Sequence, residues 1–249
     1  MYKKLVLLIT GVVFLSFSLQ SDFLTEQKRF QRVRTAIEQK QSILEKTLKE
    51  YKLSLQDLNI LLVAYKENDL LDIYAKSVSS KTYSKLFSYK ICARSGQPGP
   101  KRKQGDGQVP EGFYHIDRFN PTSNFYLSLG LNYPNTSDRI KSEKGNTGGD
   151  IFIHGSCVTI GCLPMTDDII KEIYLLAVHA KNNGQQKIPV YIFPFKMTDS
   201  NMSTYKEKYS NDPALISFWK NLKTGYDQFM ETSQEIRFSV SEKGDYVFR

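Results

Sequence analysis

Cysteine is scarce in this 249-residue sequence, and the count is odd: Cys92, Cys157 and Cys162. In an oxidising compartment an odd count leaves at least one thiol unpaired, so the sequence does not indicate a disulfide framework. We expect Cys92, which follows an alternating strand, to lie in the core. Cys157 is expected to be a small buried residue. A free, reactive thiol is therefore the more informative expectation.

Long apolar runs are also scarce. Lys3 and Lys4 precede an almost wholly apolar run over residues 5–19, which is the pattern of an export signal. This run is shorter than the roughly 20 apolar residues that a membrane-spanning helix needs. Small residues are present for cleavage, but no A-x-A-like triplet is. Residues 1–21 are thus predicted to be a signal peptide, with an uncleaved N-terminal anchor as the alternative.

The charge balance is basic, with a formal net charge of +8. The lysines and arginines are scattered rather than interleaved with aromatic residues on a pair of strands, so no nucleic-acid partner is expected. A basic exported protein can instead meet an acidic polymer such as a cell wall. Contact with a membrane is expected only if the N-terminal segment stays uncleaved. About 230 residues remain after that segment, enough for one sizeable domain.

Hydrophobic periodicity divides the rest of the chain. Apolar residues recur at three- and four-residue steps within residues 22–56 and predict an amphipathic helix, either a spacer or a helix packed on the neighbouring domain. From residue 57 the pattern changes to short strands, and those at 60–65 and 70–75 form a predicted hairpin. Further strands are predicted at 86–93, 112–116, 124–129, 150–153 and 187–193, with a turn at 132–138 and loops at 96–110 and 141–149.

The C-terminal third returns to helices. Thr166 with Asp167 and Asp168 is typical of a helix start, and that helix is expected to end near Asn182 before Gly184. Helices over 201–209 and 213–230 and a hairpin pairing 235–240 with 246–248 complete the chain. The predicted division is a β-rich domain over 57–196 and a C-terminal extension over 197–249, in an α+β protein.

The residues that carry chemistry are concentrated at 151–165, where an apolar strand leads to His154 and Cys162 precedes a helix. A cysteine is a good nucleophile only as the thiolate, so it needs a base or a positive potential nearby. Glycine bends at Gly155 and Gly161 permit the loop to bring His154 and Cys162 together. The N–H groups around Gly161 and Cys162 could then stabilise an oxyanion. This pattern predicts covalent acyl transfer with His154 as the base.

Other interpretations of these residues stay open. His154, Cys157 and Cys162 could ligate zinc, although no fourth ligand lies nearby in the sequence. Alternatively, Cys157 and Cys162 could form a disulfide across their short loop. His115 could line a cleft or be structural, and His179, late in a helix, is expected to be a solvated side chain.

The motif resembles the signature of the L,D-transpeptidase (YkuD-type) catalytic domain, in which His-Gly is followed by [S/T]-x-Gly-Cys. Here these are His154-Gly155 and Thr159-x-Gly161-Cys162. Further segments resemble the YafK-like branch of that family: Gly99-Pro-Lys101, Gly105-Asp106-Gly-Gln, Pro110-Glu-Gly-Phe-Tyr114, Leu131-Asn-Tyr-Pro-Asn135, Asp138-Arg139 and Gly148-Gly149. The resemblance covers about residues 58–195.

The resemblance implies a mixed β-sandwich with flanking N- and C-terminal helices, located in the periplasm or cell envelope. It implies action on peptidoglycan stem peptides, with no cofactor and no metal, and a wall-attached protein as a further partner. Cys162 would be the nucleophile and His154 the base, the latter oriented by backbone at Gly155 or a neighbour. The implied substrate-binding and oxyanion residues are Gly155, Ser156, Thr159, Gly161 and Arg139.

One departure from the family pattern concerns the substrate. Many members have Arg or Asn two residues after the cysteine, where this chain has Pro164. Basic residues of the Lys101–Lys103 loop, or Arg139, are the candidates to hold a stem-peptide carboxylate instead. Two alternative functions remain: a hydrolase of the same family that releases wall-linked peptides or proteins, and a non-catalytic peptidoglycan-binding scaffold.

Overall fold

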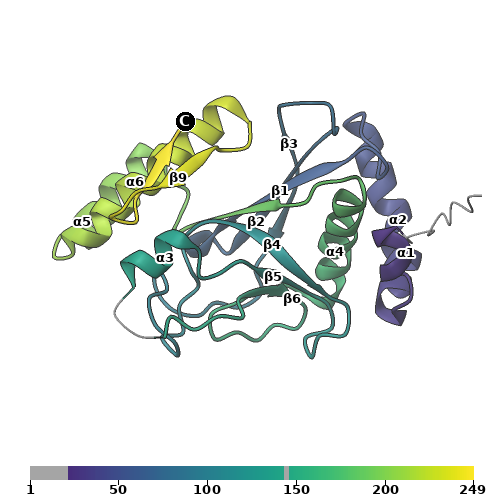
Figure 1. Ribbon diagram of the computed structural model, residues 1–249, viewed down its shortest axis with the longest axis horizontal. Coiled ribbons are helices and arrows are strands. Elements are labelled where there is room, and N and C mark those ends of the chain that lie inside the picture. The colour runs from purple at the N-terminus through teal and green to yellow at the C-terminus, as the bar shows by residue number, and fades with distance from the viewer. Residues whose placement is uncertain (1–21, 143–145) are drawn as a thin grey trace, which may run out of the picture.

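An eight-stranded mixed β-sheet forms the centre of the protein, with helices on both of its sides (Figure 1). The structure, a computed structural model, describes residues 22–142 and 146–249. The predicted signal or anchor over residues 1–21 lies outside the described residues. The expected α+β fold with flanking N- and C-terminal helices is confirmed, and its β part is one curled sheet.

The strand order is β3-β2-β1-β8-β4-β5-β6-β7. The pairs β1–β8 and β6–β7 are parallel, and the other neighbours are antiparallel. The predicted hairpin is the pair β1–β2, joined by a 3-10 turn at Lys66–Asn68. The strands are β1 (Asn59–Tyr65), β2 (Leu70–Lys76), β3 (Ser84–Lys90), β4 (Gly112–Asn120), β5 (Ser128–Leu131), β6 (Phe152–His154), β7 (Leu163–Pro164) and β8 (Ile188–Phe193).

The sheet curls far enough for its two edges to meet. β3 and β7 are at opposite ends of the strand order. Nevertheless the backbone N–H of Cys92, just beyond β3, donates to the carbonyl of Pro164 in β7 at 3.0 Å. This seam between the edges passes directly beside Cys162.

Both faces of the sheet are buried, as strand β1 shows. Leu62 and Ala64 pack into one hydrophobic core, while Leu61, Val63 and Tyr65 pack into a second core on the other face. Because successive side chains of a strand point to opposite faces, covering both faces requires a continuous apolar run. The run Ile-Leu-Leu-Val-Ala-Tyr over residues 60–65 meets that requirement.

Helices α1, α2 and α4 cover the first core. α4 (Asp167–Asn182) is capped by the Thr166 hydroxyl, as its sequence predicts. α1 (Phe23–Gln27) and α2 (Gln31–Glu50) lie beside α4 (Figure 1). The buried ammonium of Lys40 in α2 forms ion pairs with Asp168 at 2.6 Å and Glu172 at 2.9 Å. The predicted amphipathic helix is thus packed on the domain.

The C-terminal extension covers the second core. It contains α5 (Asp199–Lys208), α6 (Pro213–Thr232) and the predicted hairpin, formed by β9 (Phe238–Val240) and β10 (Tyr246–Phe248). In Figure 1 these elements lie together on the side of the sheet away from α4. The aromatic side chains of α6 that enter this core are Phe218, Trp219, Tyr226 and Phe229.

Three local predictions were wrong. The strand expected at 124–129 begins only at Ser128. The turn expected at 132–138 leads into a helix, α3 (Thr136–Lys141), whose capping box of Asn135 and Asp138 satisfies the free N–H groups of its first turn. His179 is not solvated: its side chain is buried in α4, because the turn that carries it faces the core.

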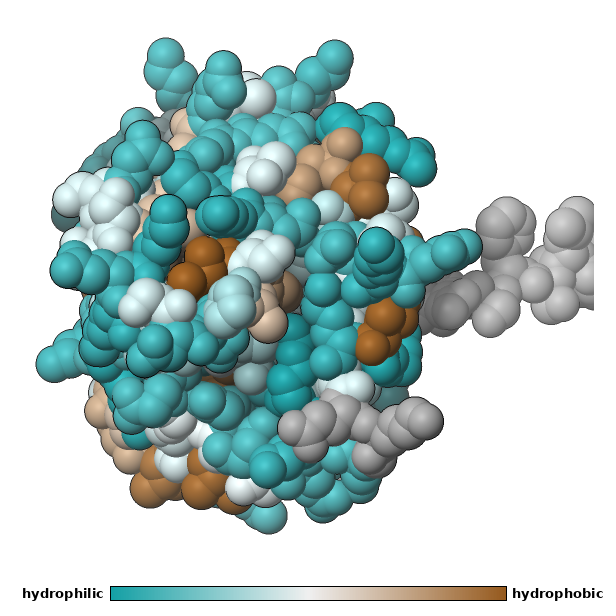
Figure 2. Space-filling model, turned by 90° about the vertical axis from the view of Figure 1, so that its left-hand side faces the viewer, coloured by the Kyte–Doolittle hydropathy of each residue, from teal (hydrophilic) through white to brown (hydrophobic). Residues whose placement is uncertain are grey.

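The surface on the α3 and α5 side is mainly hydrophilic. Figure 2 shows its hydrophobic residues in small separate patches with polar residues between them. Scattered patches of this kind are normal for a folded domain. None of the helices within residues 22–142 and 146–249 is both long and apolar enough to cross a bilayer.

Candidate active site

His154 and Cys162 are brought together by the parallel pairing of β6 and β7. Ile153 is paired with Leu163, and His154 with Pro164. Extending that register by one residue places Cys162 beside Phe152, so His154 and Cys162 occupy the same face of neighbouring strands, two positions apart. The usual strand spacing and rise put their Cα atoms roughly 8 Å apart. The two Cα positions are therefore diagonal to one another at this edge of the sheet.

The imidazole of His154 is buried and oriented by its own loop. Its Nδ1 lies 2.5 Å from the carbonyl oxygen of Gly155. A carbonyl only accepts, so Nδ1 carries the proton and donates, which leaves Nε2 as an acceptor. The Phe125 ring packs on the imidazole with centroids 4.6 Å apart. Burial lowers the pKa of His154, and its hydrogen bond to Gly155 opposes that shift only in part.

The thiol of Cys162 is partly buried and free. Its Sγ lies 3.7 Å from the carbonyl oxygen of Asp150, to which the S–H donates. Burial raises the pKa of this thiol, and the Asp150 carboxylate adds to the rise. A hydrogen bond from the Phe152 backbone and, less strongly, the Lys101 ammonium lower the pKa. The shifts of Cys162 and His154 both act against a thiolate–imidazolium pair, and the expected pair stays a prediction.

The hydroxyl of Thr159 organises the loop before Cys162. Its Oγ1 accepts hydrogen bonds from the N–H groups of Gly161 at 3.2 Å and Cys162 at 2.8 Å, and it donates to the Cys162 carbonyl at 2.9 Å. These two N–H groups are the predicted oxyanion donors. In this state both point at Thr159, so their use by a substrate requires the Thr159 hydroxyl to turn away.

Two glycines are required by close approach of the chain. Gly161 has a φ of 134°, in the range that side chains disfavour, and a Cβ there would lie 3.0 Å from the carbonyl oxygen of Gln108. A Cβ at Gly155 would lie 2.5 Å from a carboxylate oxygen of Asp167. That same carboxylate accepts the Ser156 N–H at 2.9 Å. The bends predicted between His154 and Cys162 therefore depend on glycine.

A disulfide joins Cys92 to Cys157, which corrects several expectations. Cys92 is not simply a core residue, and Cys157 is exposed rather than buried. Because Cys157 is bonded to Cys92, a Cys157–Cys162 bridge and a zinc site using Cys157 are both wrong. The pairing could not be inferred from the sequence, since it depends on the two sheet edges meeting. It leaves Cys162 as the free thiol that the odd count predicts.

A buried ion pair that the sequence did not reveal supports the loop beside Cys162. The Lys66 ammonium lies 2.9 Å from the carboxylate of Glu111. It also donates to the carbonyls of Gly99 and Val109, at 2.7 and 2.9 Å. The second carboxylate oxygen of Glu111 accepts the indole N–H of Trp219 at 2.9 Å. This network fixes the loop over residues 97–111, which carries Lys101 and approaches Gly161.

The cations that were expected to bind a stem-peptide carboxylate differ in whether they are already ion-paired. Lys101 is buried and forms an ion pair with Asp106 at 2.6 Å, and Arg102 forms one with Asp138 at 3.2 Å. Both therefore already have a carboxylate partner within the protein. Arg139, by contrast, is exposed and lines a separate cavity together with His115. The hollow that Cys162 itself lines has a volume of only about 20 Å³, room for a single water molecule.

Comparison with known proteins identifies the family of the chain. Residues 59–192 match the YkuD family, described as the L,D-transpeptidase catalytic domain. The chain belongs to the L,D-transpeptidase catalytic-domain family. Proteins of Escherichia coli K12 and O157:H7, both named "Putative L,D-transpeptidase YafK", are 42% identical to it over 201 residues, covering 80% of this chain and 77% of theirs. The family predicted from the His-Gly and Gly-Cys motif is therefore confirmed, and it supports a peptidoglycan-modifying role.

Solved structures with a more distant likeness are found as well. The helical cell shape determining protein Pgp2 of Campylobacter jejuni is 20% identical, with a TM-score of 0.44 covering 74% of this chain and 73% of that one. Bd1075 of Bdellovibrio bacteriovorus is 17% identical, with a TM-score of 0.39 covering 73% of this chain and 74% of that one.

Proposed function

We propose that this protein is an exported cysteine acyltransferase that modifies peptidoglycan stem peptides. The observation that carries the proposal is the free Cys162 thiol directly before β7, the strand that pairs with His154. The Gly155 carbonyl leaves Nε2 of His154 as an acceptor. Family membership supplies the substrate class. The location follows from the predicted export signal and is the periplasm or cell envelope.

The reaction proceeds through a thioester. His154 Nε2 takes the thiol proton as Cys162 Sγ attacks the carbonyl carbon of a stem-peptide bond. The C–N bond then breaks, and the imidazolium returns the proton to the leaving amine. An acceptor amine attacks the thioester, His154 takes its proton, and the thiol is restored as the new amide forms. With water as acceptor the same steps give hydrolysis and release of a wall-linked peptide or protein.

Burial raises the pKa of Cys162 and lowers that of His154. Both shifts favour the uncharged forms, so in this reaction the proton moves to His154 as the thiol attacks the substrate carbonyl. The N–H groups of Gly161 and Cys162 are the proposed oxyanion donors, released when Thr159 Oγ1 turns away. Ser156 and Gly155 complete the loop that faces the substrate.

The test is digestion of purified peptidoglycan by wild type, Cys162→Ala and Cys162→Ser, with mass spectrometry of the products. New crosslinks or exchanged terminal residues indicate transpeptidation, and released or shortened peptides indicate hydrolysis. We expect both variants to yield none of these products while keeping the wild-type melting temperature. Identical products from wild type and Cys162→Ala would remove Cys162 from the mechanism. Binding without any product in all three proteins would indicate the scaffold alternative.

A further inference from the structure

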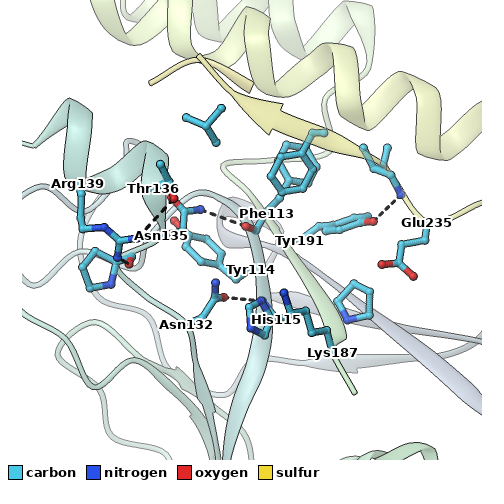
Figure 3. Close-up of a pocket in the computed structure, with 15 residues that line it drawn as sticks. Phe113, Tyr114, His115, Asn132, Asn135, Thr136, Arg139, Lys187, Tyr191 and Glu235 are labelled. Atoms are coloured by element: carbon cyan, nitrogen blue, oxygen red, sulfur yellow. Dashed lines mark hydrogen bonds between the residues drawn. The ribbon is translucent and has the colours of Figure 1, made fainter. Parts of the chain in front are cut away.

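One of several hollows on the protein is lined by neither Cys162 nor His154. It lies between β4, β8 and the segment over residues 235–240 that leads into the C-terminal hairpin (Figure 3). Its volume is about 420 Å³, against about 20 Å³ for the hollow at Cys162. A cavity of this size can hold several residues of a peptide.

The floor of this cavity is apolar. β4 and β8 are paired so that Phe113 lies opposite Tyr191 and His115 opposite Pro189. These residues therefore point to the same face of the sheet. Ile236 closes the other side, held by a hydrogen bond of 2.9 Å from its N–H to the Tyr191 hydroxyl. Phe113 and Tyr191 are only 2% and 1% exposed, so the accessible apolar surface of the lining comes chiefly from Phe238, which is 36% exposed.

The rim is basic, and its cations have no carboxylate partner among the described residues. Arg139 donates only to the carbonyl of Pro134 and, at 3.4 Å, to the hydroxyl of Thr136. The Lys187 ammonium makes no hydrogen bond or ion pair within the described part of the chain. The buried lysines of the fold, in contrast, are all ion-paired. Two unpaired cations facing one cavity are the feature that needs explanation.

His115 and Glu235 are the other two titratable groups of the lining, and they are consistent with an anion site. Figure 3 shows His115 next to Lys187, and Glu235 at the end of the cavity away from Arg139. Burial lowers the pKa of His115, and Lys187 lowers it further while Asp117 opposes. Burial raises the pKa of Glu235, and two cations outside the cavity, Lys76 and Arg237, act against that rise. The lining therefore carries two cations against one acid, which complements an anion.

We propose that this cavity is a second binding site for a peptide carboxylate. Arg139 and Lys187, which Figure 3 shows on opposite sides of β4, each bind a carboxylate oxygen of the peptide, and the exposed ring of Phe238 contacts its apolar groups. The occupant is a stem peptide of the wall other than the one that reacts at Cys162. Only this source of the carboxylate rests on the proposed function; the recognition chemistry does not.

The position of the cavity is compatible with such a role. β4 and β7 are three strands apart in the sheet order, which is roughly 14 Å at the usual spacing of strands. About four extended residues span that distance. A stem peptide held against β4 therefore keeps its neighbours in the polymer within reach of Cys162.

The protein offers a direct probe, because it contains only three histidines. His115 lines the cavity and also a hollow beside α1, so the Arg139 variant below assigns its signal to the cavity. His154 reports on the candidate active site, and His179 is buried in α4 as an internal control. Imidazole NMR signals of Cys162→Ala, which prevents turnover, are followed as a synthetic stem tetrapeptide with free carboxylates is added. We expect the His115 signals to shift with their own saturation curve and the His179 signals to stay fixed.

Variants that remove positive or negative charge from the lining test whether charge controls peptide binding. Arg139→Gln with Lys187→Gln should weaken the binding seen at His115 by about tenfold, as expected for two charge-assisted contacts. Glu235→Gln should tighten it. The matched control is Arg29→Gln with Lys206→Gln, which removes two exposed cations that do not line the cavity and should change nothing. The tetrapeptide with amidated carboxylates should fail to shift the His115 signals.

The outcomes separate this proposal from the enzymatic one. Stationary His115 signals at concentrations that move His154 overturn the second site and leave the acyltransferase intact. The second site is overturned in the same way if the double variant titrates like wild type, or if the amidated peptide binds equally well. Carboxylate-dependent shifts at His115, in a protein whose wild type yields no wall products, support the site and remove the proposed reaction.

Discussion

Cys92 and Cys157 are 65 residues apart in the sequence, and their disulfide holds their Cα atoms 5.4 Å apart. The bond crosses the seam at which the two edges of the curled sheet meet, next to the hydrogen bond from Cys92 to Pro164. It attaches the middle of the loop between His154 and Cys162 to the chain leaving β3. The loop that presents the free thiol is therefore fixed at both ends and at its centre.

Removing this disulfide should destabilise the protein and loosen the loop. For Cys92→Ser with Cys157→Ser we expect the free energy of unfolding to fall by about 2–4 kcal/mol, since the closed loop is long. Urea unfolding measures the loss. Wild type with a reductant should lose a similar amount, and the double variant should not respond to reductant. Equal stability of variant and wild type would show that the bond does not restrain the unfolded chain.

The charge of Lys101 should control the reactivity of Cys162. The ammonium lowers the pKa of the thiol, against the larger effect of burial. Lys101→Met should therefore raise that pKa further and slow alkylation of Cys162 by iodoacetamide at pH 8. Lys103→Met removes an exposed charge from the same loop and is the control. An unchanged alkylation rate in Lys101→Met would exclude electrostatic help from this residue.

The ion pair of Lys66 and Glu111 should be essential to stability. Lys66→Met leaves the Glu111 carboxylate fully buried with no cation beside it, which typically costs about 3–5 kcal/mol. Adding Glu111→Leu should recover part of that loss, because the uncompensated charge disappears. Lys90→Met, at an exposed position in β3, should change the free energy of unfolding by less than about 0.5 kcal/mol. Additive losses in the double variant would contradict direct coupling of the pair.

Asp138 should make stability depend on pH. Burial raises the pKa of Asp138 to about 6, although hydrogen bonds from Asn135 and Tyr114 and the charge of Arg102 oppose the rise. Between its ordinary value of 3.8 and about 6, the folded protein holds this proton and the unfolded chain has lost it. Stability therefore falls as pH rises through that window, by at most about 3 kcal/mol.

Asp138→Asn tests this dependence, because an amide cannot ionise. Urea unfolding of wild type and variant from pH 4 to pH 7 should show a variant whose relative stability improves as the pH rises. The exposed Asp199→Asn serves as control and should keep the wild-type slope. Parallel curves for wild type and Asp138→Asn would rule out a raised pKa at this carboxyl.

Local patterns predicted most of the elements. The Thr166 cap, the apolar run at 60–65 and the final hairpin were predicted correctly because caps, periodicity and turns act over a few residues. The short helix α3 was missed, since its Asn-Thr-Ser-Asp start is equally typical of a turn. Two-residue β7 carries no periodic signal at all and exists only because β6 lies beside it.

The sequence by itself determined the family, the glycine bends and the identity of the two candidate catalytic side chains, because those depend on residue types at fixed spacing. Only the tertiary structure decided which cysteines are bonded, why Lys66 is buried and that Arg139 faces a cavity of its own. These facts depend on how the sheet curls, which brings together residues far apart in the chain. Long-range contacts of that kind are set by the packing of both cores, and no short segment contains them.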